Sequence, residues 1–195
     1  MRYSDIRGIK KLYFTPRDVA RTLNISYASA QVTCSRYVKN GILLRLKRNF
    51  YALPEKWDNL SYTGAFLVAN ILEIPSYISL TSALSFYEIT TQIQRDFFES
   101  VSLKRTKDIN IGEKTFVFRK IGRALYGGFK KIDGYFIATP EKALLDAAYL
   151  TSIKRYDLDV NALNLGKIDK KKIKKDISMY PEMTLKFWRK YVGPL

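Results

Sequence analysis

The sequence contains no histidine and only one cysteine, Cys34. Without histidine it lacks the commonest general base of enzymes and the commonest zinc ligand. A single thiol cannot form an intramolecular disulfide or a thiolate metal cluster, so we expect a protein of the reducing cytoplasm. We interpret Cys34 as a small apolar residue in the protein interior, not as a redox sensor.

Other signatures of catalysis are also missing. Gly127-Gly128 is not followed by Lys-Ser or Lys-Thr, and no G-x-G-x-x-G motif occurs, so neither common phosphate-binding loop is present. Asp133, Glu141 and Asp146 fall near one another, and an acid beside Lys142 suggests a metal-dependent nuclease. However, Glu141 and Lys142 are adjacent and would face opposite ways on a strand. We interpret Glu141 as a first-turn partner of a helix dipole, and we expect no enzyme, metal or cofactor.

The chain has no long apolar run. The longest such stretch, Ala65–Leu72, contains Asn70 and is far shorter than the roughly 18–20 residues of a membrane span. The first eleven residues, MRYSDIRGIKK, lack an apolar segment, so we expect no secretory signal peptide. These absences predict a soluble intracellular protein without a membrane partner.

Positive charge is abundant but unevenly distributed. The formal net charge is +16. Residues 1–57 hold twelve Lys and Arg against three Asp and Glu, residues 58–150 eleven against ten, and residues 151–195 eleven against five. A basic N-terminal part and a nearly neutral middle indicate a polyanion-binding domain joined to a domain with another role. We therefore expect domains at 1–57 and 58–150, followed by a basic helical extension at 151–195.

The stretch from Phe14 to Pro54 carries the strongest functional signal. Thr15-Pro16-Arg17-Asp18 has the N-cap, N1 proline and first-turn acid of a helix start. Asn24-Ile25-Ser26 is long enough only for a turn, and a second helix is predicted from Tyr27 to about Lys39, ending at Asn40-Gly41. Two short helices joined by a tight turn are typical of a helix-turn-helix.

The second of these helices is predicted to have two different faces. At 100° per residue, Ala30, Thr33, Cys34 and Tyr37 share the inward face. The outward face is small, polar or basic and has no acid, which suits the major groove of DNA. It consists of Ala28, Ser29, Gln31, Val32, Ser35, Arg36 and Lys39.

A basic β-hairpin follows the two helices. Alternation over Ile42–Leu46 and the return through Phe50–Leu53 predict two strands, and Lys47-Arg48-Asn49 connects them. Cations at a hairpin tip would meet phosphates or the minor groove, as in the wing of a winged helix-turn-helix. Such layouts also serve as interaction modules, but turn, caps, hairpin and charge together favour DNA binding. The predicted DNA-binding residues are Arg17, Tyr27, Ser29, Gln31, Ser35, Arg36, Lys39, Lys47, Arg48 and Asn49.

The rest of the chain predicts a small α+β domain. Ile6, Ile9, Leu12 and Tyr13 suggest a first helix, and residues 55–59 a linker. Helices are expected at Ala65–Leu72, Ser82–Tyr87 and Lys142–Leu150, and strands at Tyr77–Leu80, Phe97–Leu103, Thr115–Ile121 and Gly134–Ala138. In the tail, Ile173 and Ile177 form an apolar pair on a charged helix, and an apolar segment follows Pro181. The fold class is therefore α+β: an N-terminal winged helix-turn-helix, a small mixed α/β domain and a basic helical tail.

Three stretches in this order resemble the AbiEi-like antitoxins and transcriptional regulators of type IV toxin–antitoxin (abortive infection) systems. They are the winged helix with Gly41–Arg45 and Phe50–Leu53, the stretch Tyr77–Leu84, and the stretch Thr139–Asp146. Asn49 stands where the wing turn of the family usually has glycine, and asparagine can adopt the same backbone conformation. The sequence after Thr151 resembles nothing that we can name.

The resemblance implies a repressor of its own promoter that counters a nucleotidyltransferase-like toxin encoded beside it, without forming a stable complex with that toxin. The residues themselves support only the DNA-binding half of this hypothesis. The alternative is a stand-alone winged-helix regulator whose second domain senses a ligand or dimerises. An enzyme acting on nucleic acid is disfavoured by the missing histidine and the scattered acids.

Overall fold

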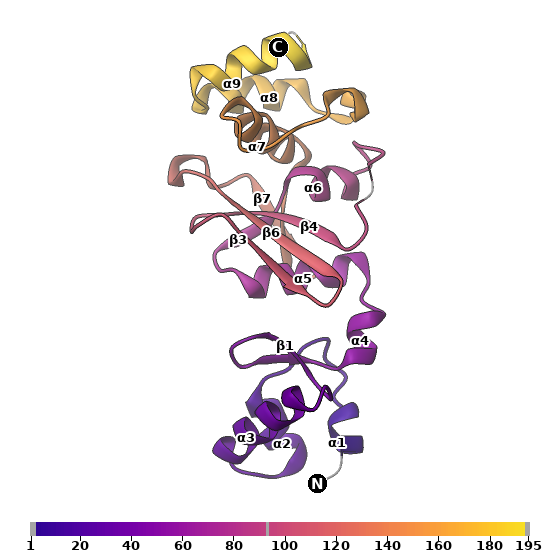
Figure 1. The fold of residues 1–195 in the computed structure, drawn as a ribbon. Helices are drawn as coiled ribbons and strands as arrows, with labels where there is room; N and C mark the ends of the chain where they lie inside the picture. Colours follow the sequence, from indigo (N-terminus) through magenta and orange to yellow (C-terminus); the bar gives the residue numbers. More distant parts are fainter. Residues whose placement is uncertain (1–2, 93, 194–195) are drawn as a thin grey trace. The chain divides into compact units, whose positions relative to one another are not determined.

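A computed structural model describes residues 3–92 and 94–193 and has the expected α+β composition (Figure 1). Over the described residues it contains nine α-helices and two β-sheets. The chain divides into two compact units, residues 1–68 and 69–195. The domain limits at residues 57 and 150 remain predictions from the sequence. None of the helices within the described ranges has the length and apolarity that crossing a membrane requires.

Over its described residues, the first unit places three helices before a two-stranded hairpin and a fourth helix after it. Its core includes Ile6, Val19, Ala30 and Cys34 of the first three helices and Tyr51 of the hairpin. In chain order the elements are α1 (Tyr3–Arg7), α2 (Pro16–Leu23), α3 (Tyr27–Lys39), β1 (Leu44–Lys47), β2 (Phe50–Ala52) and α4 (Pro54–Asp58), and α5 (Tyr62–Leu72) follows.

Two predictions for this unit were wrong. The first helix is shorter than its apolar pattern suggested, because it ends at Arg7 before Gly8, a poor helix former. The chain then extends to Phe14, which exchanges two backbone hydrogen bonds of 2.9 Å with Tyr51 of β2. The apolar residues after position 8 therefore lie in an irregular segment and not on a helix face.

The predicted linker at residues 55–59 is instead helix α4. Pro54 occupies its first turn, where a missing N–H costs nothing. Trp57 is buried, and the Lys56 ammonium donates to the Ile9 carbonyl at 2.6 Å. The many charged residues of this segment gave no sign of a helix. The short helix is held in place by the buried Trp57 side chain.

The second unit is built on a six-stranded mixed sheet with the order β5-β6-β4-β3-β8-β7. β4 pairs with β6 in parallel, as does β3 with β8, and the remaining pairs are antiparallel. The strands are β3 (Ser76–Ile78), β4 (Phe97–Ser102), β5 (Lys107–Ile111), β6 (Lys114–Lys120), β7 (Phe129–Ile132) and β8 (Tyr135–Ala138).

Two strands, β5 and β7, were not predicted from the sequence. Both are edge strands of this sheet, and their sequences are KDINI and FKKI. Edge strands carry charge, lysine above all, which discourages pairing with other chains and also weakens the apolar alternation that identifies a strand. The four inner strands were all predicted, with ends that differ by one or two residues.

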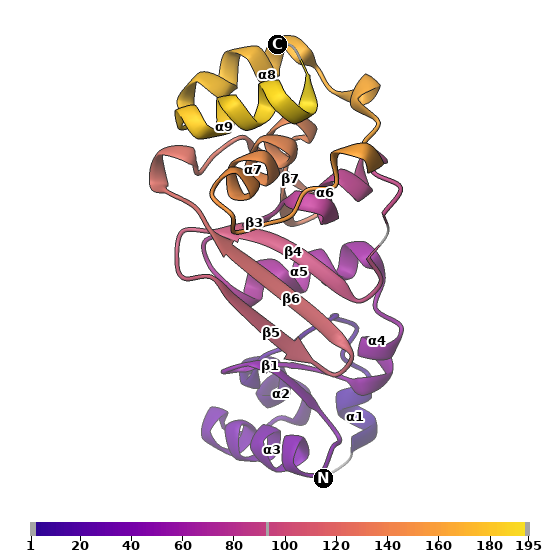
Figure 2. The ribbon, with the colours of Figure 1, turned by 45° about the horizontal axis from the view of Figure 1, so that its top comes forward.

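Helix α7 (Pro140–Ser152) lies between two helical layers. It contacts α6 (Leu80–Phe86) on one side and α8 (Lys170–Asp176) and α9 (Glu182–Phe187) on the other. Figure 2 shows α8 and α9 side by side above α7. Ile173 and Ile177 are buried, as their spacing predicted. The basic C-terminal helices are therefore part of the second unit and pack against α7.

Candidate nucleic-acid interface

Helix α2 begins with the cap that its sequence specifies. The backbone N–H and the hydroxyl of Thr15 both donate to the Asp18 carboxylate at 2.8 Å, and Lys11 donates to it at 2.5 Å. Burial would raise the pKa of Asp18, but the hydrogen bonds from Lys11 and Thr15 outweigh it and lower that pKa to about 2. The cap fixes the start of α2, where the Arg17 side chain is exposed.

A tight turn then sets the start of helix α3. Asn24 adopts the left-handed backbone conformation, with φ of 50°. The Ser26 hydroxyl accepts a hydrogen bond of 3.1 Å from the Ser29 N–H, which satisfies one of the free donors of α3. The helix runs from Tyr27 to Lys39, and Gly41 follows with φ of 70°. The predicted extent and both predicted ends of α3 are confirmed.

The inward face of α3 is also confirmed. Its buried residues are Ala30, Thr33, Cys34 and Tyr37, the four that helical spacing placed together. Burial raises the pKa of the Cys34 thiol to about 11, so the thiol stays protonated and poorly reactive at neutral pH. Cys34 is thus part of the core of the first unit.

The outward face of α3 is small, polar and basic. Ser29, Ser35, Arg36 and Lys39 are exposed, and α3 contains no acidic residue. Gln31 is half-buried and donates to the Tyr27 hydroxyl at 3.4 Å. A shallow depression runs along this face, lined by Gln31, Val32, Ser35, Arg36 and Lys39. Such a surface offers hydrogen-bond donors and positive charge to a polyanion.

Val32 in this depression is 67% exposed. Val32 belongs to the predicted outward face of α3 but is not among the predicted DNA-binding residues. The sequence could have identified Val32 as a functional residue, because it is an apolar residue at a position that helical spacing places on the outward face. An exposed valine among polar neighbours offers an apolar contact on this face.

The hairpin presents the second group of predicted residues. Lys47 pairs with Phe50 across the turn, and its ammonium lies 4.7 Å from the centre of the Phe50 ring. Arg48 is exposed at the tip. Asn49 has φ of 64°, the positive value that its side chain was expected to tolerate. The structure therefore arranges the predicted residues as an α3 group, a hairpin group and Arg17 on α2.

The stretches Tyr77–Leu84 and Thr139–Asp146 meet in a buried polar cluster of the second unit. The Asp146 carboxylate is wholly buried and accepts hydrogen bonds of 2.9 Å from the Tyr77 and Ser79 hydroxyls. The Lys142 ammonium donates to Asp146 at 2.5 Å and to the Tyr180 hydroxyl at 2.8 Å. Burial raises the pKa of Asp146, and Lys142 with the two hydroxyls opposes this effect.

This cluster has the features of a structural core and not of a metal site. Asp133 is exposed in the turn between β7 and β8, and Glu141 faces α8, where it accepts from the Asp169 N–H at 3.4 Å. The acids that lie near one another in sequence are thus separated in the fold. Nowhere in residues 3–92 or 94–193 do three or more Cys, Asp or Glu side chains gather in a way that could hold a metal.

The first unit thus combines a capped helix pair, an outward face of α3 without acidic residues and a basic hairpin. Residues 2–54 match the family model of the AbiEi antitoxin transcriptional regulators. The predicted resemblance to the AbiEi-like family is confirmed over this segment. No curated protein and no solved structure matches the chain.

Proposed function

We propose that the first unit is a winged helix-turn-helix that binds duplex DNA, with α3 in the major groove and the β1–β2 hairpin as the wing. The observation that carries the proposal is the division of α3 into a buried face and an exposed face that holds Arg36 and Lys39 but no acid. The extended segment that pairs Phe14 with Tyr51 supports it by fixing the hairpin to the helical core.

We further propose that the protein represses its own promoter. The family match at residues 2–54 supports a regulator. Selection of bound duplexes from a pool that contains random sequences and the promoter of the gene tests this directly. We expect the parent protein to enrich a segment of the promoter. The Arg36→Ala variant should not enrich that segment. Recovery of random sequence by both proteins would contradict promoter recognition.

The antitoxin role concerns the middle part of the chain, residues 58–150. This part carries eleven Lys and Arg against ten Asp and Glu, so it has little electrostatic reason to lie on DNA. We propose that it counters a nucleotidyltransferase-like toxin encoded beside the gene, without a stable complex. The double variant Arg36→Ala, Arg48→Ala, expressed from an independent promoter, should lose repression of a promoter reporter and still rescue cells that express the toxin. Failure of rescue by the folded, abundant variant would contradict this division of roles.

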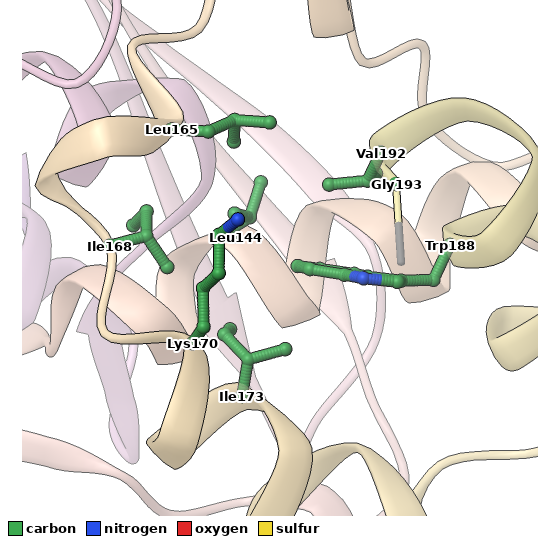
Figure 3. A pocket seen from close by; sticks show the side chains of 8 residues that line it. All are labelled: Leu144, Leu165, Ile168, Lys170, Ile173, Trp188, Val192 and Gly193. Carbon is green, nitrogen blue, oxygen red and sulfur yellow. The ribbon is translucent and has the colours of Figure 1, made fainter. Parts of the chain in front are cut away.

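A stand-alone regulator whose second unit senses a ligand is the alternative function, and one observation favours it. The second unit contains an apolar cavity with a lysine at its opening, formed between α7, α8 and the C-terminal helical segment (Figure 3). A gene neighbourhood without a nucleotidyltransferase reading frame would favour this alternative.

A further inference from the structure

The cavity of the second unit is lined almost entirely by apolar side chains. Leu144 of α7, Ile173 of α8 and Trp188 are buried at its base, and Ile168 is nearly buried. Half-buried side chains surround its opening (Figure 3). The complete lining is Leu144, Leu165, Ile168, Lys170, Ile173, Trp188, Val192 and Gly193.

Of the described residues that line the cavity, Lys170 is the only charged one. It is exposed, and Figure 3 shows its side chain among the apolar side chains of the lining. Its neighbour Lys172 forms ion pairs with Glu141 and Asp169, at 3.7 and 3.9 Å. Within the described part of the chain, Lys170 forms no such pair. An exposed ammonium at the edge of an apolar cavity can pair with the anionic end of a ligand whose apolar part enters the cavity.

The size of the cavity restricts the ligand further. Its volume is about 70 Å³. A cavity of about 150 Å³ is known to hold a benzene ring, so an aromatic ring does not fit here, whereas a chain of about two or three carbons does. The ligand must therefore combine a short aliphatic chain with one anionic group.

We propose that this cavity binds a short-chain aliphatic carboxylate, with the carboxylate on the Lys170 ammonium and the chain against Leu144, Ile173 and Trp188. The proposal is independent of DNA binding, because every residue of the cavity belongs to the second unit. If the second unit senses a ligand, short-chain aliphatic carboxylates are the chemical class of that ligand.

Titration of the full chain with acetate, propionate, butyrate and hexanoate, followed by methyl NMR, tests the proposal. The Ile168, Ile173 and Leu144 methyl signals should shift saturably, with dissociation constants in about the millimolar range. Affinity should rise about fourfold per added methylene up to butyrate and then stop rising, because the cavity is full. Equal affinity for acetate and butyrate, or no saturable shift of these signals, would overturn the proposal.

Two variants separate the roles of the charge and the cavity. Lys170→Gln should weaken butyrate at least about threefold and leave neutral butanol unaffected. Lys171→Gln should change neither, because Lys171 is equally exposed but does not line the cavity. Val192→Phe at the opening should abolish the shifts in a protein whose other methyl signals are unchanged. If each of the two single variants, Lys170→Gln and Val192→Phe, still bound butyrate like the parent protein, the ligand would lie elsewhere and the proposal would be overturned.

Discussion

Tyr77 and Asp146, 69 residues apart in the chain, are joined by a buried hydrogen bond of 2.9 Å from the phenol hydroxyl to the carboxylate. Ser79 donates to the same carboxylate oxygen, and Lys142 donates to the other. Two of the stretches that carry the family resemblance thus meet at one carboxylate. Their contact fastens β3 to α7.

Lys142→Met should destabilise the protein by about 3–5 kcal/mol, because it leaves the wholly buried Asp146 without its cation. The double variant Lys142→Met, Asp146→Asn should recover a large part of this loss, since the amide is uncharged and its oxygen still accepts from Tyr77 and Ser79. Urea unfolding of the two variants and the parent protein measures both free energies. A cost below about 1 kcal/mol for the single variant would show that the pair contributes little.

Glu99 is expected to make stability depend on pH. It is 2% exposed and accepts hydrogen bonds of 3.0 Å from the Thr81 N–H and the Tyr156 hydroxyl. Burial raises its pKa from 4.5 to about 7, although the hydrogen bonds from Tyr156 and Thr81 oppose this. Because the folded state binds the proton more tightly, the stabilising contribution is complete below pH 4.5 and is lost as the pH rises through about 7.

The expected loss between these pH values is up to about 3 kcal/mol. Glu99→Gln should remove this part of the pH dependence, because glutamine does not ionise. The free energy of unfolding, measured by urea at pH 5, 6, 7 and 8 for both proteins, gives the comparison. Parallel curves for the two proteins would show that Glu99 does not titrate in this range.

The sequence predicted best those elements whose signals are local. Thr15, Ser26 and Gly41 mark helix ends with caps that few other residues provide, and both faces of α3 followed from spacing alone. Edge strands β5 and β7 and helix α4 were missed, because their charged residues obscure the apolar pattern. The cavity beside Lys170 could not be predicted, since it is formed by segments that are remote in sequence.

Arg36 and Arg48 should contribute to DNA binding in different ways. Arg36→Ala removes a group that can contact bases from α3, so it should cost about 1–3 kcal/mol on the preferred sequence and reduce discrimination against random DNA. Arg48→Ala at the hairpin tip should weaken binding to all sequences alike. Binding measurements on the selected duplex and a random duplex at one salt concentration separate the two effects. Unchanged discrimination with Arg36→Ala would show that another face of α3 meets the bases.

Val32 should contact the methyl group of a thymine, because it is the exposed apolar residue of the depression along α3. Replacing each thymine of the selected duplex by uracil removes one methyl group without changing base pairing. At one of these positions, replacement of thymine by uracil should lower the affinity of the parent protein about fourfold. The Val32→Ala variant should bind the thymine and the uracil duplex equally. A parent protein that is insensitive at every position would exclude the contact while leaving DNA binding intact.

The salt dependence of binding to the promoter duplex tests the central claim most directly. About five to eight phosphate contacts from the first unit should release counterions, so the plot of log K against log salt should have a slope of about −4.5 to −7. Arg48→Ala should make this slope shallower by about one unit, as expected for the loss of one phosphate contact. A slope shallower than about −2 for the parent protein would contradict the assignment of the first unit as a DNA-binding domain.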